Sequence, residues 1–119
     1  MERTYPEHYQ HLRKLNGKLT KEVRGTMTGF SQLYAASTAD GALSAKVKQL
    51  MALSIAVTVR CDGCIAYHVH DALRAGATRP EIMESIAVAV MMGGGPAMVY
   101  GCEALEALEQ FEAVGVPSA

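Results

Sequence analysis

The segment that decides how this chain folds and acts is Cys61-Asp62-Gly63-Cys64-Ile65-Ala66-Tyr67-His68. The second thiol and the imidazole follow the first thiol by three and seven residues, and side chains at such spacings lie on one side of an α-helix. Two cysteines this close can cycle between a dithiol and a disulfide, and an imidazole can accept a thiol proton. The segment therefore predicts a helix that carries thiol redox chemistry.

The cysteine pair lies at the expected start of this helix, where free backbone N–H groups and the helix dipole favour a thiolate. His68 follows Cys64 by four residues and can reach its sulfur directly or through one water. A thiolate attacks the weak O–O bond of a peroxide and becomes a sulfenic acid. The partner cysteine then forms a disulfide, which an external reductant must reopen.

Two other interpretations of the motif are a structural zinc site and a pair of buried thiols without chemistry. Zinc would bind Cys61, Cys64 and His68, but a closed zinc site needs a fourth ligand. His70 is a poor fourth ligand, because a residue two positions after His68 points away around the helix. We therefore predict neither a metal nor another cofactor.

The chain of 119 residues corresponds to a single domain, residues 1–119. Half of its residues are hydrophobic, and its 11 basic and 12 acidic residues give a net charge of −1 without a basic cluster for nucleic acid. Charged residues near the N-terminus leave no apolar signal segment, which predicts a cytoplasmic protein. In that reducing compartment a CxxC pair is typically catalytic or metal-binding. Cys102 is expected to be buried as a small hydrophobic residue.

Good helix formers and capping signals predict an all-α fold of about six helices. The expected helices begin near Pro6, Thr20, Ser44, Asp62, Thr78 and Pro96, and they end near Leu15, Ala36, Val59, Gly76, Met92 and Glu112. Thr20, Ser44 and Asp62 are expected to cap the second, third and fourth helices. Asn16-Gly17 is expected to end the first helix. Thr78 and Glu81 have the spacing of a capping box, and Pro80 suits a first helical turn.

Parts of the chain are unusually apolar. Residues 85–102 contain no charge, but the turn Gly93-Gly94-Gly95-Pro96 interrupts them, so they predict two helices rather than a membrane span. Leu50–Val59 and Ile86–Met92 are apolar around most of the helix circumference. A small domain cannot hide two such helices, and we therefore predict a homo-oligomer.

Residues 44–89 resemble the core of the carboxymuconolactone decarboxylase superfamily, and within it the alkylhydroperoxidase AhpD-like branch. The matching features are the apolar helix Lys48–Val57, Arg60 before Cys61, the CxxCxxxH motif, the segment His68–Thr78 and the turn Gly93–Pro96. The resemblance implies an AhpD-like helical bundle that assembles as a trimer or hexamer. It also implies a thiol-dependent peroxidase or disulfide reductase that works without metal, flavin or haem.

The resemblance further implies a proton relay through Cys61, Cys64, His68 and a glutamate twelve residues before the first cysteine. Proximity to His68 and this relay favour Cys64 as the peroxide-reactive thiol and Cys61 as the resolving thiol. Gln49 occupies the glutamate position. An amide can orient His68 or a water, but it cannot accept a proton as a carboxylate can.

We predict a thiol-dependent peroxidase that reduces hydroperoxides through the CxxC pair with a histidine base, using an external thiol or protein reductant. Candidates to replace the missing acid are Glu84 and Glu103. Alternatives to the peroxidase are a general dithiol–disulfide oxidoreductase, a decarboxylase-type lyase, and a non-catalytic redox-sensing oligomeric module in which Gln49 marks lost turnover. The superfamily's decarboxylases act on a lactone acid without a cysteine pair, so the CxxC favours the redox branch.

Overall fold

The computed structural model describes residues 2–119, and its regular secondary structure consists of α-helices without a strand in that range. The predicted all-α fold of six helices is confirmed. In chain order the helices are α1 (Tyr5–Glu22), α2 (Arg24–Thr38), α3 (Ala45–Thr58), α4 (Asp62–Arg74), α5 (Arg79–Gly93) and α6 (Gly95–Val114).

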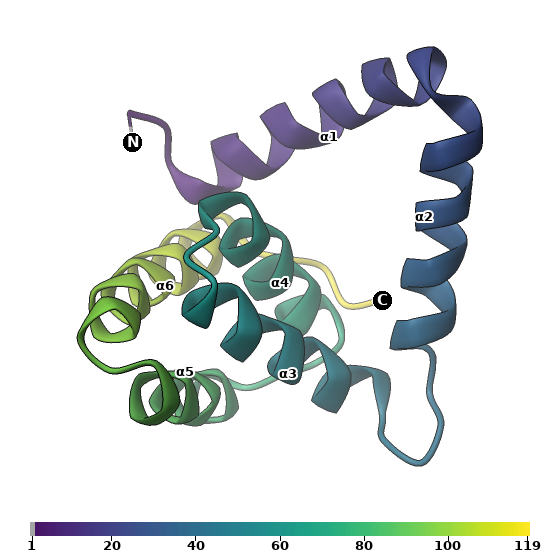
Figure 1. Ribbon diagram of the computed structural model, residues 1–119. Helices are drawn as coiled ribbons and strands as arrows, with labels where there is room; N and C mark the ends of the chain where they lie inside the picture. The colour runs from purple at the N-terminus through teal and green to yellow at the C-terminus, as the bar shows by residue number, and fades with distance from the viewer. Residues whose placement is uncertain (1) are drawn as a thin grey trace.

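Helices α3 to α6 pack around a common core, and α1 lies across α4 and α6 (Figure 1). The largest fully buried side chains include Leu53 of α3, Ile65 of α4, Ile82 of α5 and Leu108 of α6. Helix α2 contains no buried residue and stands apart from this body, joined to it by α1 and by the loop before α3 (Figure 1). The fold is therefore a four-helix core with a two-helix arm.

The predicted side-chain caps of α3 and α5 are confirmed. The Ser44 hydroxyl accepts the N–H of Val47 at 3.1 Å at the start of α3. At the start of α5, the Thr78 hydroxyl accepts the N–H of Glu81 at 3.3 Å, and the Glu81 carboxylate accepts the N–H of Thr78 at 2.8 Å. These oxygens satisfy N–H groups that lack partners in the first turn of a helix.

The predicted boundary between the first two helices is wrong. Helix α1 continues through Asn16 and Gly17 to Glu22, and the break falls at Val23, whose φ and ψ are −131° and 58°. An interior glycine costs a helix only about 1 kcal/mol relative to alanine, so it need not end one. Thr20 does not cap α2; its hydroxyl donates to the Asn16 carbonyl oxygen at 2.7 Å inside α1.

The apolar segment at residues 85–102 is divided into two helices, as predicted. Gly94 ends α5 and precedes α6, and its φ of 71° is a conformation that favours glycine. Pro96 follows in the first turn of α6, where its missing N–H has no helical partner to lose. Within residues 2–119, no helix combines the length and the hydrophobicity that a membrane span requires.

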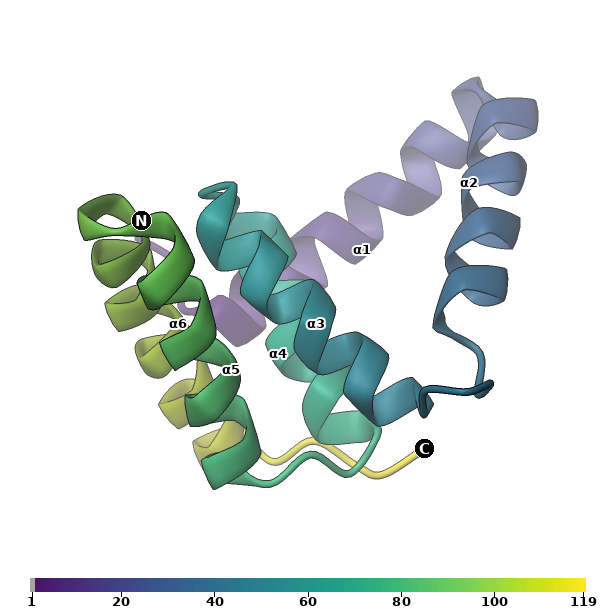
Figure 2. The same ribbon diagram turned by 60° about the horizontal axis from the view of Figure 1, so that its bottom comes forward.

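Helices α3 and α5 each bury one side and expose the other. They lie side by side (Figure 2), and Met51 of α3 and Val88 of α5 line the same shallow hollow between them. What we call the apolar face consists of exposed apolar residues from α3 and its C-cap, from α5 and from the start of α6; its members are Met51, Ile55, Val59, Val88, Met91, Met92, Met98 and Val99. The homo-oligomer expected from these helices stays a prediction.

Candidate functional site

A tight turn at the end of α3 leads into the cysteine pair. Arg60 adopts a left-handed φ of 60°. Its N–H donates to the Val57 carbonyl oxygen at 3.3 Å, and the N–H of Cys61 donates to the Ala56 carbonyl oxygen at 3.2 Å. This pattern is a Schellman motif, in which glycine usually takes the left-handed position. The turn delivers Cys61 to the position directly before α4.

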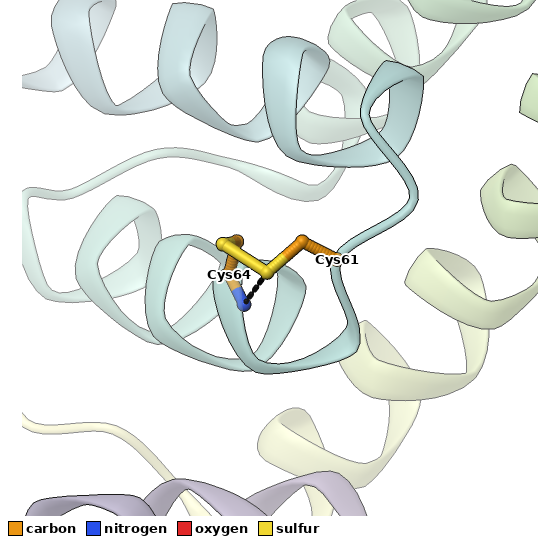
Figure 3. The surroundings of a disulfide bond; sticks show 2 residues. All are labelled: Cys61 and Cys64. Atoms are coloured by element: carbon orange, nitrogen blue, oxygen red, sulfur yellow. Dashed lines mark hydrogen bonds between the residues drawn. A yellow bond between two sulfur atoms is a disulfide. The ribbon is translucent and has the colours of Figure 1, made fainter.

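Cys61 is the N-cap of α4 and is disulfide-bonded to Cys64 in the first turn (Figure 3). The Cys61 sulfur accepts the N–H of Cys64 at 3.1 Å. The prediction that Asp62 caps this helix is therefore wrong by one residue. The cap is Cys61, and its sulfur takes the place of the usual capping oxygen. The free N–H groups and the dipole at this helix end would stabilise a thiolate on Cys61 after reduction.

His68 lies one turn beyond Cys64 on α4, and its ring contacts Gln49 of α3. The His68 Nδ1 and Gln49 Oε1 atoms are 2.9 Å apart. Gln49 is buried, whereas His68 is half-buried. Gln49, which stands where the resemblance implies a glutamate, thus lies beside the histidine and presents an amide to it.

Two residues that the sequence did not indicate extend this contact. The Gln49 Nε2 group donates to the Tyr34 hydroxyl oxygen at 3.1 Å, and that hydroxyl donates to Asp71 Oδ2 at 2.5 Å. The other Asp71 oxygen lies 2.8 Å from Nδ1 of His70. Asp71 follows His68 by three residues, so helical spacing could have indicated it. Tyr34 belongs to α2, and no local pattern could have placed it here.

The surroundings of these groups set their protonation. Burial lowers the pKa of His68, and the negative charge of Asp71 partly opposes that shift. Burial raises the pKa of Tyr34, and its hydrogen bond to Asp71 raises that pKa further. At neutral pH the site therefore holds a neutral imidazole that can accept a proton and a phenol that keeps its own.

A groove of about 1020 Å³ lies between α1, α2 and α4, and Cys61, Cys64 and His68 all line it. Gln49 is absent from its wall and lies deeper in the fold. The apolar part of the wall includes Leu12, Leu15, Leu19, Phe30 and Tyr67. The groove can therefore hold an organic molecule beside both sulfur atoms and the imidazole.

The other residues considered from the sequence lie elsewhere. Glu84 is exposed on α5, and Glu103 of α6 lies near Asp62; neither is hydrogen-bonded to His68. Cys102 is a free, exposed thiol, so the prediction that it is buried is wrong. His70 is half-buried, and its ring is stacked on that of Tyr9 with the ring centroids 4.0 Å apart. Across residues 2–119, no three His, Cys, Asp or Glu side chains cluster as a metal site requires.

Known proteins with the same fold share much of this sequence. The carboxymuconolactone decarboxylase family model matches residues 24–107. A family member from Legionella pneumophila, solved in its apo form, is 43% identical and has a TM-score of 0.87, with 90% of this chain and 96% of that chain covered. A Thermotoga maritima member, described as a candidate for involvement in an antioxidative response, is 31% identical with a TM-score of 0.79 over 91% of this chain and 92% of that chain. An uncharacterised protein of Cupriavidus necator is 40% identical over 75% of this chain and 79% of its own length.

Proposed function

This chain belongs to the carboxymuconolactone decarboxylase family, and we propose that it is a thiol-dependent peroxidase acting through Cys61 and Cys64. The observation that carries the proposal is the disulfide between these residues at the start of α4, on a groove that His68 also lines. The description of the Thermotoga maritima relative supports the same kind of chemistry.

The first step forms a sulfenic acid. Neutral His68 takes the proton of the Cys64 thiol, which precedes it by one helical turn. The Cys64 thiolate attacks the hydroxyl oxygen of the hydroperoxide, and the O–O bond breaks as the S–O bond forms. The alkoxide leaves as an alcohol by taking the proton from His68. Sulfur has then given two electrons to the peroxide.

The second step forms the disulfide. The Cys61 thiolate attacks the sulfur of the Cys64 sulfenic acid, and hydroxide leaves as water with the proton that Cys61 released. One hydroperoxide and two thiols thus become an alcohol, water and a disulfide. An external thiol or reduced protein supplies the two electrons that reopen it. That reductant attacks Cys64, because the departing Cys61 thiolate is stabilised by the Cys64 N–H and the helix N-terminus.

We also propose that the protein is a homo-oligomer, a trimer or hexamer, whose subunits meet through the apolar face. Exposed apolar residues gathered on neighbouring helices are typical of protein–protein contacts. Two helices of the four-helix core carry most of this face, so a second copy would cover what the core leaves exposed. A cytoplasmic location would supply the thiol reductant that the cycle requires.

A general dithiol–disulfide oxidoreductase is the second candidate, and the observation in its favour is Gln49. Exchange between a dithiol and a disulfide needs a thiolate and a good leaving thiol, but no carboxylate beside the histidine. Such an enzyme would use the same two sulfurs and the same groove with a disulfide in place of the peroxide.

Stopped-flow oxidation of the reduced protein by hydrogen peroxide and by cumene hydroperoxide tests the proposal. The wild type should react faster than free cysteine, Cys64→Ser should lose the fast reaction, and Cys61→Ser should stop at the sulfenic acid. His68→Ala should slow the reaction roughly 100-fold, the lower range for a general base. Cys102→Ser removes a thiol outside the groove and serves as the control. Reaction no faster than free cysteine would refute the peroxidase, and rapid reduction of a disulfide substrate would then favour the oxidoreductase.

A further inference from the structure

We propose that Asp71 is a positioning residue for His68 and acts through a hydrogen-bonded array of Gln49 and Tyr34; this inference rests on the proposed peroxidase function. Within residues 2–119, no carboxylate is hydrogen-bonded to His68. The Nδ1 atom of His68 contacts the amide oxygen of Gln49 instead. From Gln49, two further hydrogen bonds lead through the Tyr34 hydroxyl to the carboxylate of Asp71. The array therefore connects His68 to the acid that Gln49 cannot supply.

The carboxylate determines the direction of every hydrogen bond in the array. An ionised Asp71 can only accept, so the Tyr34 hydroxyl must donate its hydrogen to Asp71. The Tyr34 oxygen must then accept from the Gln49 amide nitrogen, which leaves the Gln49 oxygen facing His68. An amide oxygen only accepts, and Nδ1 of His68 therefore carries the hydrogen.

This direction gives His68 the tautomer that a base needs. With hydrogen on Nδ1, the unprotonated nitrogen is Nε2, and Nε2 is free to accept the Cys64 proton. Each bond also polarises the next, so the Asp71 charge favours the imidazolium that forms during the reaction. Gln49 cannot pass a proton along the array. The proton taken from Cys64 must therefore stay on His68 until the departing alkoxide takes it.

The contacts around Asp71 hold its carboxylate in place. Its second oxygen lies 2.8 Å from Nδ1 of His70, and the His70 ring is stacked on Tyr9 of α1 with centroids 4.0 Å apart. Titratable or charged groups that face this region come from three helices; they are Tyr9 and Arg13 of α1, Tyr34 of α2, and Tyr67, His68, His70 and Arg74 of α4. Both oxygens of Asp71 are thus bound, one of them on the path to His68.

The same array attaches the arm helix α2. The side-chain hydrogen bonds that join α2 to α3 and α4 both end at the Tyr34 hydroxyl. The Tyr34 ring also lies nearly parallel to the His68 ring, at 16° and with centroids 6.2 Å apart. A substitution at Tyr34 could thus loosen one wall of the groove as well as break the array. A test must report on His68 itself.

The decisive measurement is the tautomer of His68, from the ¹⁵N chemical shifts of its ring in the oxidised, full-length protein. In the wild type at pH 8, Nδ1 should carry the hydrogen. Asp71→Asn can donate to Tyr34 instead of accepting, which lets Tyr34 and Gln49 reverse, so the Nε2–H tautomer should become populated. Tyr34→Phe should have the same effect, because it leaves Gln49 free to turn. Tyr100→Phe removes the same hydroxyl from α6 outside the groove and should leave the tautomer unchanged.

The rate of peroxide reaction provides the second readout. Asp71→Asn and Tyr34→Phe should each slow it about tenfold, less than loss of His68, because the base itself remains. Adding Gln49→Glu to Asp71→Asn places a carboxylate directly at Nδ1 and should restore both the tautomer and the rate.

Three results would overturn the inference: a wild-type His68 with hydrogen on Nε2, an unchanged tautomer in both Asp71→Asn and Tyr34→Phe, or a slower reaction with an unchanged tautomer. The tautomer is measured without peroxide, so the inference can be judged even if the wild type does not react with peroxide. That outcome would refute the proposed function alone.

Discussion

Replacing Arg60 with glycine should stabilise this protein. Arg60 is the single residue other than glycine with a positive φ in the described range of the chain, and its side chain is exposed without a hydrogen bond or ion pair to residues 2–119. The equivalent position at the end of α4 is Gly76, where N–H groups of Gly76 and Ala77 donate to carbonyl oxygens of the last turn at 3.0 and 2.9 Å. The Schellman motif thus ends both α3 and α4, and only the motif after α4 has the glycine that the left-handed position favours.

The expected gain follows from two opposing effects. Removing the Cβ from a left-handed residue relieves about 1–2 kcal/mol of strain. Glycine also has more freedom in the unfolded chain, which costs about 0.5–1 kcal/mol on folding. The two effects leave a net gain in the free energy of unfolding of about 0–1.5 kcal/mol. A gain near the middle of this range raises the melting temperature of a chain this size by roughly 3 °C.

Thermal unfolding of the oxidised protein, at one fixed protein concentration, measures this change. Arg60→Ala keeps the Cβ and should bring no comparable gain. Gly76→Ala introduces a Cβ at a φ of 92° and should lower the free energy of unfolding by about 1 kcal/mol or more. The strain argument is refuted if Arg60→Gly melts at or below the wild-type temperature, or if Arg60→Ala stabilises equally.

Three further predictions concern Glu103, His68 and the apolar face. Burial and the neighbouring Asp62 raise the pKa of Glu103, so the folded state loses stability as pH rises above the ordinary carboxyl value of 4.5. Glu103→Gln should therefore raise the free energy of unfolding at pH 7. The gain should be at most about 1 kcal/mol, because water screens the half-buried pair of Glu103 and Asp62. Denaturant titration should show that this gain shrinks below pH 4.5. Burial lowers the pKa of His68 below 6.5, so NMR titration of His68 in the oxidised protein should give a midpoint under that value. The stability that neutral His68 contributes is complete above pH 6.5 and is lost as pH falls through the folded pKa. A midpoint at or above 6.5 would contradict this expectation. If the apolar face joins subunits, substituting Met91 and Met92 with glutamate should weaken the oligomer, because the interface would then bury unpaired charges. The mass found by light scattering should fall toward the 12.7 kDa of one chain. An unchanged mass would exclude these residues from the interface.

The helical elements were predictable where a side chain near in sequence ends or begins a helix. The Ser44 and Thr78 caps and the break at Gly94 depend on residues within one turn, and each was found where the sequence predicted it. The boundary between α1 and α2 was not predictable, because Asn16-Gly17 is also compatible with a continuing helix. The exposure of Cys102 depends on which side of α6 faces the core, and a single cysteine carries no information about that.

The sequence by itself determined that Cys61, Cys64 and His68 share one side of a helix, since the spacing of residues along a helix is a local property. Together with the family resemblance, it also indicated that Gln49 stands where a carboxylate is expected. Tertiary structure alone decided that a residue of α2, Tyr34, connects Gln49 to Asp71, and that α1 and α2 form the wall of the groove. Contacts between helices depend on how the whole core packs, and no local spacing encodes which distant hydroxyl arrives beside a given amide.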